Sequence, residues 1–575
     1  MTGRLGLFTG VLKLSRSGCC RILGHGPRSG SRRILSSVKN PAKAAFRDSA
    51  RPNVSPRGKI IAATLASGAV AASILVGLQR SPVSTGEQGE QGERNDSAEA
   101  AVLDGPVRHF RLAEVKLHDG TSERPWVTKG DSIYDITDWV EAHPGGEVIL
   151  RAAGGSIDPY WDIFTIHKRQ DVYEILEQYF IGKVHPQDLI DGKMPMEAIE
   201  DPFVNDPARD TRLRVLTARP CNAETPGEGL SQFLTPNEMF YVRNHMWVPA
   251  VEGSEHQLTI ELNDGEEVSY TVRELKERFK HHKITATLQC AGNRRKNMTD
   301  HAKQTNGLQW AVGAISSAEW EGVKLRDVLA DAGLNVTDPP EDAHHAQFMG
   351  LEAYGASIPI EKAIDARGDV LLAFRMNGRD LPSDHGFPLR VIVPGTVAAR
   401  SVKWLRRIVI AADESPSQWQ QRDYKCFGPN EGASADWARA RAIQEMPVTS
   451  AITRIRRAAS SSSDAPLRIE GYAYSGGGRE ITRVDISVDN GRTWDQAELL
   501  DDASAGARAW CWKRWRYTGV VRDAQLPTTF LVKATDEAYN TQPETHGSIY
   551  NVRGNLATAW HRVEYPAAAD EANET

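Results

Sequence analysis

One cysteine near the middle of the 575-residue chain stands beside two arginines. Cys290 ends a short apolar, strand-like stretch, and a Gly-Asn turn separates it from Arg294 and Arg295. A thiolate is favoured by nearby cations and by metals, whereas a structural cysteine prefers an apolar pocket. Cys290 is therefore a reactive nucleophile, a metal ligand or a small packing residue, and its immediate neighbours leave all three open.

Two histidines nearer the N-terminus have a spacing and a setting that suit a haem iron. His143 precedes a Pro-Gly-Gly turn that lets backbone approach a flat ligand, and His167 follows 24 positions later. A single histidine is more often a surface or core residue, but two neutral imidazoles facing each other across a haem iron suit electron transfer. Residues 110–184 resemble the cytochrome b5 fold over their whole length, with the HPGG turn as the strongest match. This resemblance implies that His143 and His167 are the axial ligands of haem b.

The composition indicates a multidomain protein without a global charge bias. A chain of this length predicts about three or four folded units plus tails. The net charge of −6 gives no reason to expect nucleic-acid binding, so any anion recognition must be local. The cysteines form no CxxC pair, which disfavours a disulfide framework and a zinc ribbon; they are Cys19, Cys20, Cys221, Cys290, Cys426 and Cys511.

The N-terminal segment has the composition of a targeting sequence. Residues 1–59 are rich in Arg, Lys and Ser, with Asp48 as the only acid, which is typical of a mitochondrial transit peptide. The uncharged, mostly apolar run at 60–78 predicts a stop-transfer or sorting segment over 60–80. A presequence followed by such a segment resembles the bipartite signals of intermembrane-space proteins. The alternative is a permanent single-pass anchor.

Periodicity divides the remainder into three folded units. The central region alternates strand-like and helical segments and lacks GxGxxG and Walker loops, so it predicts an α+β fold without the common nucleotide sites. The last region has alternating apolar residues and an Asn-Gly turn, as in a β-sandwich. The expected boundaries are 81–105 for a disordered linker, 106–186 for a small α+β haem unit, 187–207 for a hinge, 208–440 for the central unit, 441–566 for the sandwich and 567–575 for a tail.

Five polar segments of the central unit carry a family resemblance: FYVRNHM, CAGNRR, AYGASIP, DHGFPLRVIVPG and ARSVKW. Each is weak alone, but in order and wording they resemble the molybdopterin domain of the sulfite oxidase family. The resemblance implies that Cys290 gives a thiolate to molybdenum, and a soft donor suits a metal already held by dithiolene sulfurs. In the same family the last unit resembles an immunoglobulin fold and forms a homodimer contact.

The resemblance also implies a pocket that binds an oxyanion through guanidinium groups. Its expected members are Arg243, Arg295 and, from the GGGR loop of the last unit, Arg479, with Trp310 as an apolar wall and Tyr354 as a hydrogen-bond donor. Plainer interpretations stay open, because a tryptophan of a large domain is often core, a tyrosine can be structural and a glycine loop is often only a turn. Arg294 is expected to pack or pair nearby.

The pterin and its phosphate need many hydrogen-bond donors. The residues that the resemblance implies for them are Tyr241, Val242, Arg243, Asn244, His245, Glu352, His385, Arg390, Ser401, Val402 and Lys403. One departure concerns Glu352, which either replaces an aspartate of a longer loop in relatives or makes no contact.

The implied activity is oxidation of sulfite to sulfate by oxygen-atom transfer at a molybdenum–molybdopterin cofactor. Electrons would pass one at a time through the haem to cytochrome c in the mitochondrial intermembrane space, in a homodimeric enzyme of the sulfite oxidase class, for which oxygen is another acceptor. Two alternatives remain. A nitrate reductase shares both cofactor modules, although there the haem unit follows the molybdenum domain and a flavin reductase is added. A b5-type electron carrier with a degenerate central domain would need no molybdenum.

Overall fold

The protein was analysed as a computed structural model, which describes residues 107–140, 143, 146–164, 167, 170–195, 201–432, 435–457, 466–501, 508–521 and 527–565. The expected transit peptide, the apolar segment at 60–80, the linker at 81–105 and the tail at 567–575 lie outside these residues. Within the described ranges, no helix is both long and apolar enough to cross a membrane.

The haem unit is a small α+β domain. Its four strands pair in the order β1-β4-β3-β2, and Gly130, with φ of +56°, makes the tight turn between β2 and β3. Val127, Tyr134, Ile136, Trp161 and Leu176 form a buried cluster between this sheet and the helices. The elements are β1 (His109–Phe110), α1 (Leu112–Val115), β2 (Trp126–Lys129), β3 (Ser132–Asp135), 3-10 turns at Thr137–Trp139 and Gly146–Ala152, α2 (Asp158–Ile163), α3 (Gln170–Glu177), β4 (Phe180–Val184) and a 3-10 turn at Pro186–Asp188.

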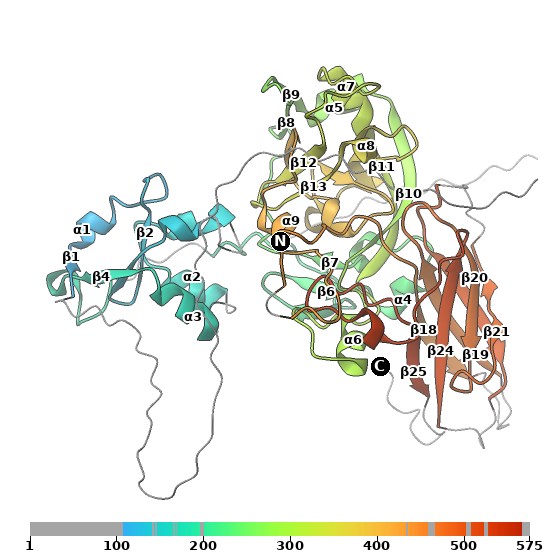
Figure 1. Cartoon of the computed structure of the whole chain (residues 1–575). Coiled ribbons are helices and arrows are strands. Elements are labelled where there is room, and N and C mark those ends of the chain that lie inside the picture. The colour runs from blue at the N-terminus through green and yellow to red at the C-terminus, as the bar shows by residue number, and fades with distance from the viewer. Residues whose placement is uncertain are drawn as a thin grey trace, which may run out of the picture. The chain divides into compact units, whose positions relative to one another are not determined.

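Among the described residues, the central unit contains two five-stranded sheets and one three-stranded sheet. Helices accompany these sheets, as in an α+β fold (Figure 1). One large sheet has the order β10-β11-β14-β15 with β16 on β14, the other has the order β13-β12-β17-β8-β9, and the small sheet is β5-β6-β7. The strands are β5 (Arg214–Thr217), β6 (Asn222–Glu224), β7 (Val242–Arg243), β8 (Gln257–Glu261), β9 (Glu267–Thr271), β10 (His281–Gln289), β11 (Ile315–Lys324), β12 (His345–Gly350), β13 (Gly355–Pro359), β14 (Leu371–Met376), β15 (Arg379–Asp380), β16 (Arg390–Ile392) and β17 (Leu405–Ala411).

Short helices connect these strands. α5 begins with a capping box, in which the Thr271 hydroxyl accepts a hydrogen bond from the Glu274 amide and the Glu274 carboxylate accepts one from the Thr271 amide. The helices are α4 (Gly227–Leu230), α5 (Val272–Arg278), α6 (Arg295–His301), α7 (Leu325–Asp331), α8 (Ile360–Ile364) and α9 (Gln418–Gln421), with 3-10 turns at Asn237–Met239, Ser383–His385 and Ala398–Arg400.

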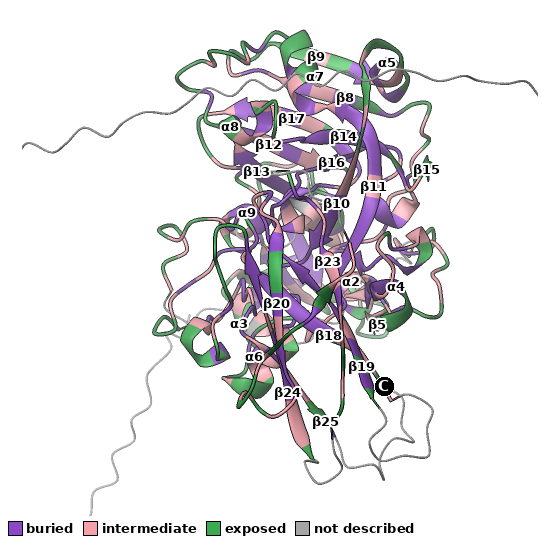
Figure 2. Ribbon diagram, turned by 90° about the vertical axis from the view of Figure 1, so that its right-hand side faces the viewer, coloured by how far each residue is buried: buried purple, intermediate pink, exposed green. Residues whose placement is uncertain are grey.

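The long hairpin of β10 and β11 determines where Cys290 lies. The two strands pair from His281 opposite Val323 to Gln289 opposite Ile315, and the last four residues of β10 are buried (Figure 2). β10 therefore ends inside the molecule, and the next residue is Cys290.

The C-terminal unit is a sandwich of two antiparallel four-stranded sheets, with strand orders β18-β19-β23-β22 and β21-β20-β24-β25. Ile469, Val484, Trp515, Phe530 and Val532 fill the space between them. Asn490 and Gly491 both have positive φ after β20, as expected for the Asn-Gly turn. This confirms the β-sandwich prediction. The strands are β18 (Thr449–Arg457), β19 (Leu467–Tyr474), β20 (Ile481–Ser487), β21 (Asp495–Gln496), β22 (Glu498–Leu499), β23 (Lys513–Gly519), β24 (Thr528–Asp536) and β25 (His561–Tyr565), with a 3-10 turn at His546–Ile549.

Candidate functional site

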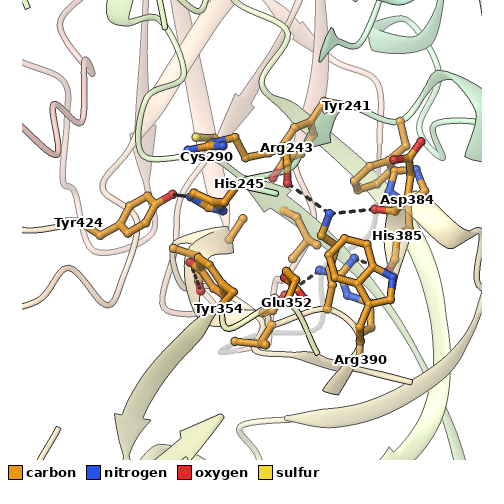
Figure 3. Close-up of a pocket in the computed structure, with 18 residues that line it drawn as sticks. Tyr241, Arg243, His245, Cys290, Glu352, Tyr354, Asp384, His385, Arg390 and Tyr424 are labelled. Atoms are coloured by element: carbon orange, nitrogen blue, oxygen red, sulfur yellow. Dashed lines mark hydrogen bonds between the residues drawn. The ribbon is translucent and has the colours of Figure 1, made fainter. Parts of the chain in front are cut away.

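Cys290 lies on the wall of a cavity in the central unit that is rich in cations and aromatic rings (Figure 3). The lining residues come from the segment around β7, the end of β10, the loop after β12, the segments around β16 and the segment after α9. They are Phe240, Tyr241, Arg243, His245, Leu288, Cys290, Glu352, Tyr354, Asp384, His385, Arg390, Ala398, Ala399, Ser401, Val402, Lys403, Trp404 and Tyr424.

The loop that carries Cys290 is tightly held. The Cys290 amide donates to the Ala314 carbonyl at 3.0 Å, and the Asn293 side chain accepts from the Ala314 amide and donates to the Tyr472 hydroxyl. A Cβ atom on Gly292 would lie 2.7 Å from the Arg295 guanidinium and 2.9 Å from the Trp310 ring, so only glycine fits there. The backbone thus fixes the direction in which the thiol points.

The two arginines after Cys290 have different tasks. Arg294 is fully buried and donates to the carbonyls of Ser450 and Ala559 at 3.0 and 2.7 Å, which ties the loop to the C-terminal unit. Arg295 donates to Leu308 and Asn555, and it lies within electrostatic reach of Cys290. Burial lowers the pKa of Arg295, and the charge of Cys290 counteracts this shift.

Most of the predicted cofactor residues meet at this cavity. The predicted residues that line it are Tyr241, Arg243, His245, Glu352, Tyr354, His385, Arg390, Ser401, Val402 and Lys403. Val242 and Asn244 lie between liners, and the buried Asn244 side chain accepts a hydrogen bond from Lys403. Trp310 is buried in the core against Gly292 and is not among the liners.

Arg479 lies elsewhere in the described structure. Its guanidinium donates to Glu445 at 3.0 Å and lies 3.4 Å from the Asp536 carboxylate. It lines a separate cavity whose lining residues all belong to the C-terminal unit. The GGGR loop does approach the central unit, since the Gly477 amide donates to Gly395, but the arginine turns toward carboxylates instead of the Cys290 cavity.

Two residues near Cys290 were missed from the sequence. Tyr424 lines the cavity, its hydroxyl lies 3.0 Å from His245 Nε2, and it is within electrostatic reach of Cys290. Arg553, from the segment before β25, is also within electrostatic reach of Cys290, and both carboxylate oxygens of buried Asp423 hold its guanidinium. The RDYK and NVRGN segments that contain them have no unusual composition, so only the three-dimensional contacts reveal them.

The two tyrosines of the cavity are therefore used differently. Tyr424 presents its hydroxyl beside His245, and burial raises the pKa of Tyr424 to about 12, which keeps its O–H protonated. Tyr354 donates its hydroxyl to the Ala399 carbonyl at 2.9 Å and stacks on His245. Tyr354 thus supports the wall, while Tyr424 faces the cysteine end.

The other end of the cavity has more donors than acceptors. Arg390 donates to His385 and Ser401 carbonyls while its Nε has no partner, and Lys403 donates to the backbone of Arg243 and Asp384. Burial lowers the pKa of Arg390 and of Lys403, so a bound anion would favour their charged forms. A buried Glu352 oxygen also has no partner, and burial raises the pKa of that carboxyl. A phosphorylated pterin fits this end of the cavity, which offers the unpartnered Nε of Arg390, the basic groups of Arg390 and Lys403, and the free carboxyl oxygen of Glu352.

The haem unit places its two predicted ligands face to face. The rings of His143 and His167 have centres 6.2 Å apart and planes within 9°. A metal–imidazole bond of about 2 Å on each side, plus the distance from nitrogen to ring centre, gives roughly this separation for one ion between them. The His167 Nδ1 lies 3.1 Å from the Phe164 carbonyl, which orients Nε2 toward an iron, and burial lowers the pKa of His167 and keeps it neutral.

The described residues contain no group of three or more His, Cys, Asp or Glu side chains that could hold a metal ion. Among these described residues, the predicted metal ligands are the His143–His167 pair and Cys290. Both arrangements fit metals whose remaining ligands come from an organic cofactor, a porphyrin in one case and a dithiolene in the other.

Three family models match the chain. A cytochrome b5-like haem/steroid binding domain matches residues 111–185, an oxidoreductase molybdopterin binding domain matches residues 245–419, and a molybdenum-cofactor oxidoreductase dimerisation domain matches residues 440–567.

Known proteins match across these three regions. Sulfite oxidase from Gallus gallus is 48% identical over 79% of this chain and 99% of its own length. Mitochondrial sulfite oxidase from Rattus norvegicus is 43% identical over 79% of this chain and 84% of its own length. The crystal structure of the sulfane dehydrogenase SoxCD from Paracoccus pantotrophus is 27% identical, with a TM-score of 0.50, and covers 67% of this chain and 100% of the SoxCD chain. Nitrate reductase [NADH] 1 from Phaseolus vulgaris is 36% identical over 61% of this chain and 42% of its own length.

Proposed function

The chain belongs to the sulfite oxidase family, and we propose that it oxidises sulfite to sulfate at a molybdenum bound by molybdopterin and by the Cys290 thiolate. The observation that carries the proposal is the setting of Cys290. It shares a donor-rich cavity with Arg243 and lies within electrostatic reach of Arg295 and Arg553. A soft ligand beside several guanidinium groups suits a metal that acts on a small oxyanion.

The cofactor, when bound, would supply the oxygen atom that sulfite gains and accept the two electrons that sulfite loses. The protein's own side chains bind and orient the substrate. Arg295 and Arg553 are held by Asn555 and Asp423, so their guanidinium groups are fixed before sulfite arrives. Burial raises the pKa of the Tyr424 hydroxyl, so this hydroxyl stays protonated and can donate a hydrogen bond.

The donor-rich end of the cavity would hold the pterin and its phosphate. We assign this task to Tyr241, His245, Glu352, Ser401 and Val402, together with His385, Arg390 and Lys403. Arg390 is already fixed by two carbonyls, so its unpartnered Nε is available to an acceptor on the ligand.

The haem unit would carry the electrons out one at a time. His143 and His167 would hold haem b between their facing imidazole rings, and the haem would supply one-electron transfer. We propose cytochrome c as the external acceptor and the mitochondrial intermembrane space as the compartment, since relatives are named as mitochondrial and the N-terminal composition is that of a bipartite signal. The match of residues 440–567 to a dimerisation domain supports a homodimer.

We propose that each part of the chain has the task that the sequence predicts for it. Residues 106–186 bind haem, residues 187–207 connect, residues 208–440 bind the molybdenum cofactor, and residues 441–566 form the dimer contact. Arg553 adds one task to the last unit, because its guanidinium lies within electrostatic reach of Cys290.

The test is sulfite-dependent reduction of cytochrome c by the purified full chain, with nitrate and no-substrate controls and with molybdenum and iron measured in the same sample. Sulfite should support reduction of cytochrome c, whereas nitrate and the no-substrate control should not. We expect about one molybdenum and one iron per chain. Iron without stoichiometric molybdenum would instead identify an electron carrier. Formation of nitrite from nitrate with a reduced dye as electron donor, without oxidation of sulfite, would identify a nitrate reductase.

A further inference from the structure

Asp384 lines the cofactor cavity and contacts several of the residues that are assigned to the cofactor. It directly precedes His385 in the 3-10 turn Ser383–His385, and its side chain is buried. Its Oδ1 accepts a hydrogen bond from the Asn244 amide group at 2.9 Å, and its backbone carbonyl accepts one from Lys403 Nζ at 2.9 Å. Lys403 also donates to the Asn244 side chain. Three residues assigned to the cofactor are thus adjacent to Asp384 or bonded to it.

Arg209 binds the carboxylate of Asp384. Its Nε donates to Asp384 Oδ2 at 2.8 Å and its Nη2 donates to Oδ1 at 2.9 Å, which is the planar two-bond geometry of a guanidinium–carboxylate pair. The same Nη2 donates to Asp206 at 2.9 Å, and Asp206 accepts from the Val248 amide. Arg209 stands at the end of the segment that connects the haem unit to the central unit.

The charges of this group depend on one another. Burial would raise the pKa of Asp384, but the hydrogen bonds and the charge of Arg209 outweigh that effect and lower it, so Asp384 stays ionised. Burial lowers the pKa of Lys403, and Asp384 is the first group that counteracts this shift. Without Arg209, the carboxylate would be left as a buried charge with only part of its compensation.

Building on the proposed function, we propose that Arg209 is a positioning residue for the cofactor site. It fixes Asp384, and through Asp384 it sets the places of Asn244, His385 and Lys403. The same ion pair fastens the end of the interdomain segment to the wall of the cofactor cavity. A purely structural pair would instead contribute to folding stability without affecting how firmly the cofactor is held.

The chain offers a matched control in the same segment. Arg212 also pairs with an aspartate, Asp210, at 2.7 Å, but its side chain is 44% exposed, and its acidic partners, Asp210 and Glu228, do not line the cavity. Arg209→Met and Arg212→Met therefore remove the same side chain from two arginine–aspartate pairs, of which only one touches the cofactor wall.

The experiment incubates the purified holoenzymes and follows the molybdenum and pterin that remain on the chain, with haem content and the melting temperature measured in parallel. We expect Arg209→Met to lose molybdenum and pterin about tenfold faster than the wild type, the lower end of the effect seen for residues that support metal ligands. Arg212→Met should match the wild type, and haem content should be the same in all three. Asp384→Asn should lose the cofactor faster too, and the double variant should be no worse than Arg209→Met, because the two residues act as one pair.

Equal rates of cofactor loss in Arg209→Met and Arg212→Met would overturn the proposal, as would additive effects in the double variant. If Arg209→Met does not accumulate, Arg209→Lys carries the comparison, because it keeps the charge but cannot make two parallel hydrogen bonds. Wild-type rates of cofactor loss in Arg209→Lys would then overturn the proposal. Failure of the proposed function is a separate outcome, since it appears as absent molybdenum or absent sulfite turnover in the wild type.

Discussion

The haem unit and the cavity around Cys290 use the chain in different ways. His143 and His167 lie 24 positions apart in one small domain, and the walls around them come from the same domain. The cavity gathers side chains from Phe240 to Tyr424, and the charge of Arg553, from beyond β24, acts on Cys290 at its wall. The first site is local, whereas the second collects residues from across the central unit, and its Cys290 loop is also bonded to the C-terminal unit.

This difference has a consequence for how each site can fail. Arg294 links the Cys290 loop to Ser450 and Ala559, so damage to the packing between the two units reaches the molybdenum site directly. His143 and His167 lie in one domain, so their site does not depend on the packing between the central and C-terminal units. Substitutions at the Cys290 cavity should therefore lower sulfite oxidation with every electron acceptor and leave the haem absorbance unchanged. Substitutions at the haem pair should change the haem absorbance and abolish only the reduction of cytochrome c.

The largest effect is expected for Cys290→Ser. An alcohol is a poor ligand for a soft metal site, so sulfite oxidation should fall by at least about a thousandfold with every acceptor, the scale expected when an essential group is removed. The haem absorbance spectrum should not change. Cys511→Ser is the control, because Cys511 lies in the sandwich unit and donates its thiol to the Thr285 carbonyl. Full turnover of Cys290→Ser would show that the ligand assignment is wrong.

The next test breaks the local site alone. His167→Ala should lose haem and all reduction of cytochrome c, while sulfite oxidation with ferricyanide, a small one-electron acceptor, should remain close to the wild-type rate. His109→Ala, an exposed histidine of the same domain, should leave both activities unchanged. If His167→Ala keeps its haem spectrum, the axial pair is not His143 and His167.

The same contrast explains how much could be predicted. Local signals predicted the b5-like unit, the sandwich with its Asn490–Gly491 turn, and Cys290 at the end of a buried strand. They did not reveal Tyr424 or Arg553, because a tyrosine in RDYK and an arginine in NVRGN acquire their roles only from tertiary contacts. The pairing of Arg553 with Asp423 spans 130 positions. Arg479 has a more suggestive glycine loop, but Glu445 and Asp536 bind its side chain in a different cavity.

The choice between the two C-terminal arginines gives a sharper test of the assembled site. Arg553→Gln should lower kcat/KM for sulfite by about a hundredfold, because a charged donor near the metal end is lost and Asp423 remains as a buried unpaired carboxylate. Arg479→Gln should remain within about threefold of the wild type, since its guanidinium serves Glu445 and Asp536 at a partly exposed place. Steady-state kinetics of both variants, with molybdenum content measured, decide the assignment. The reverse order of effects would return the substrate role to Arg479.

The smallest effect concerns the two tyrosines that share the His245 ring. Tyr424→Phe removes a hydroxyl beside the cysteine end, and we expect kcat/KM for sulfite to fall about tenfold, the equivalent of one hydrogen bond. Tyr354→Phe removes a hydroxyl that donates to the Ala399 carbonyl, so it should lower the melting temperature by a few degrees and leave kcat/KM nearly unchanged. Because phenylalanine keeps the ring contacts with His245, the pair isolates the two hydroxyls from packing. A loss of kcat/KM in Tyr354→Phe with none in Tyr424→Phe would place the substrate at the Ala399 side of the cavity, away from Arg553, and would contradict the site built around Cys290.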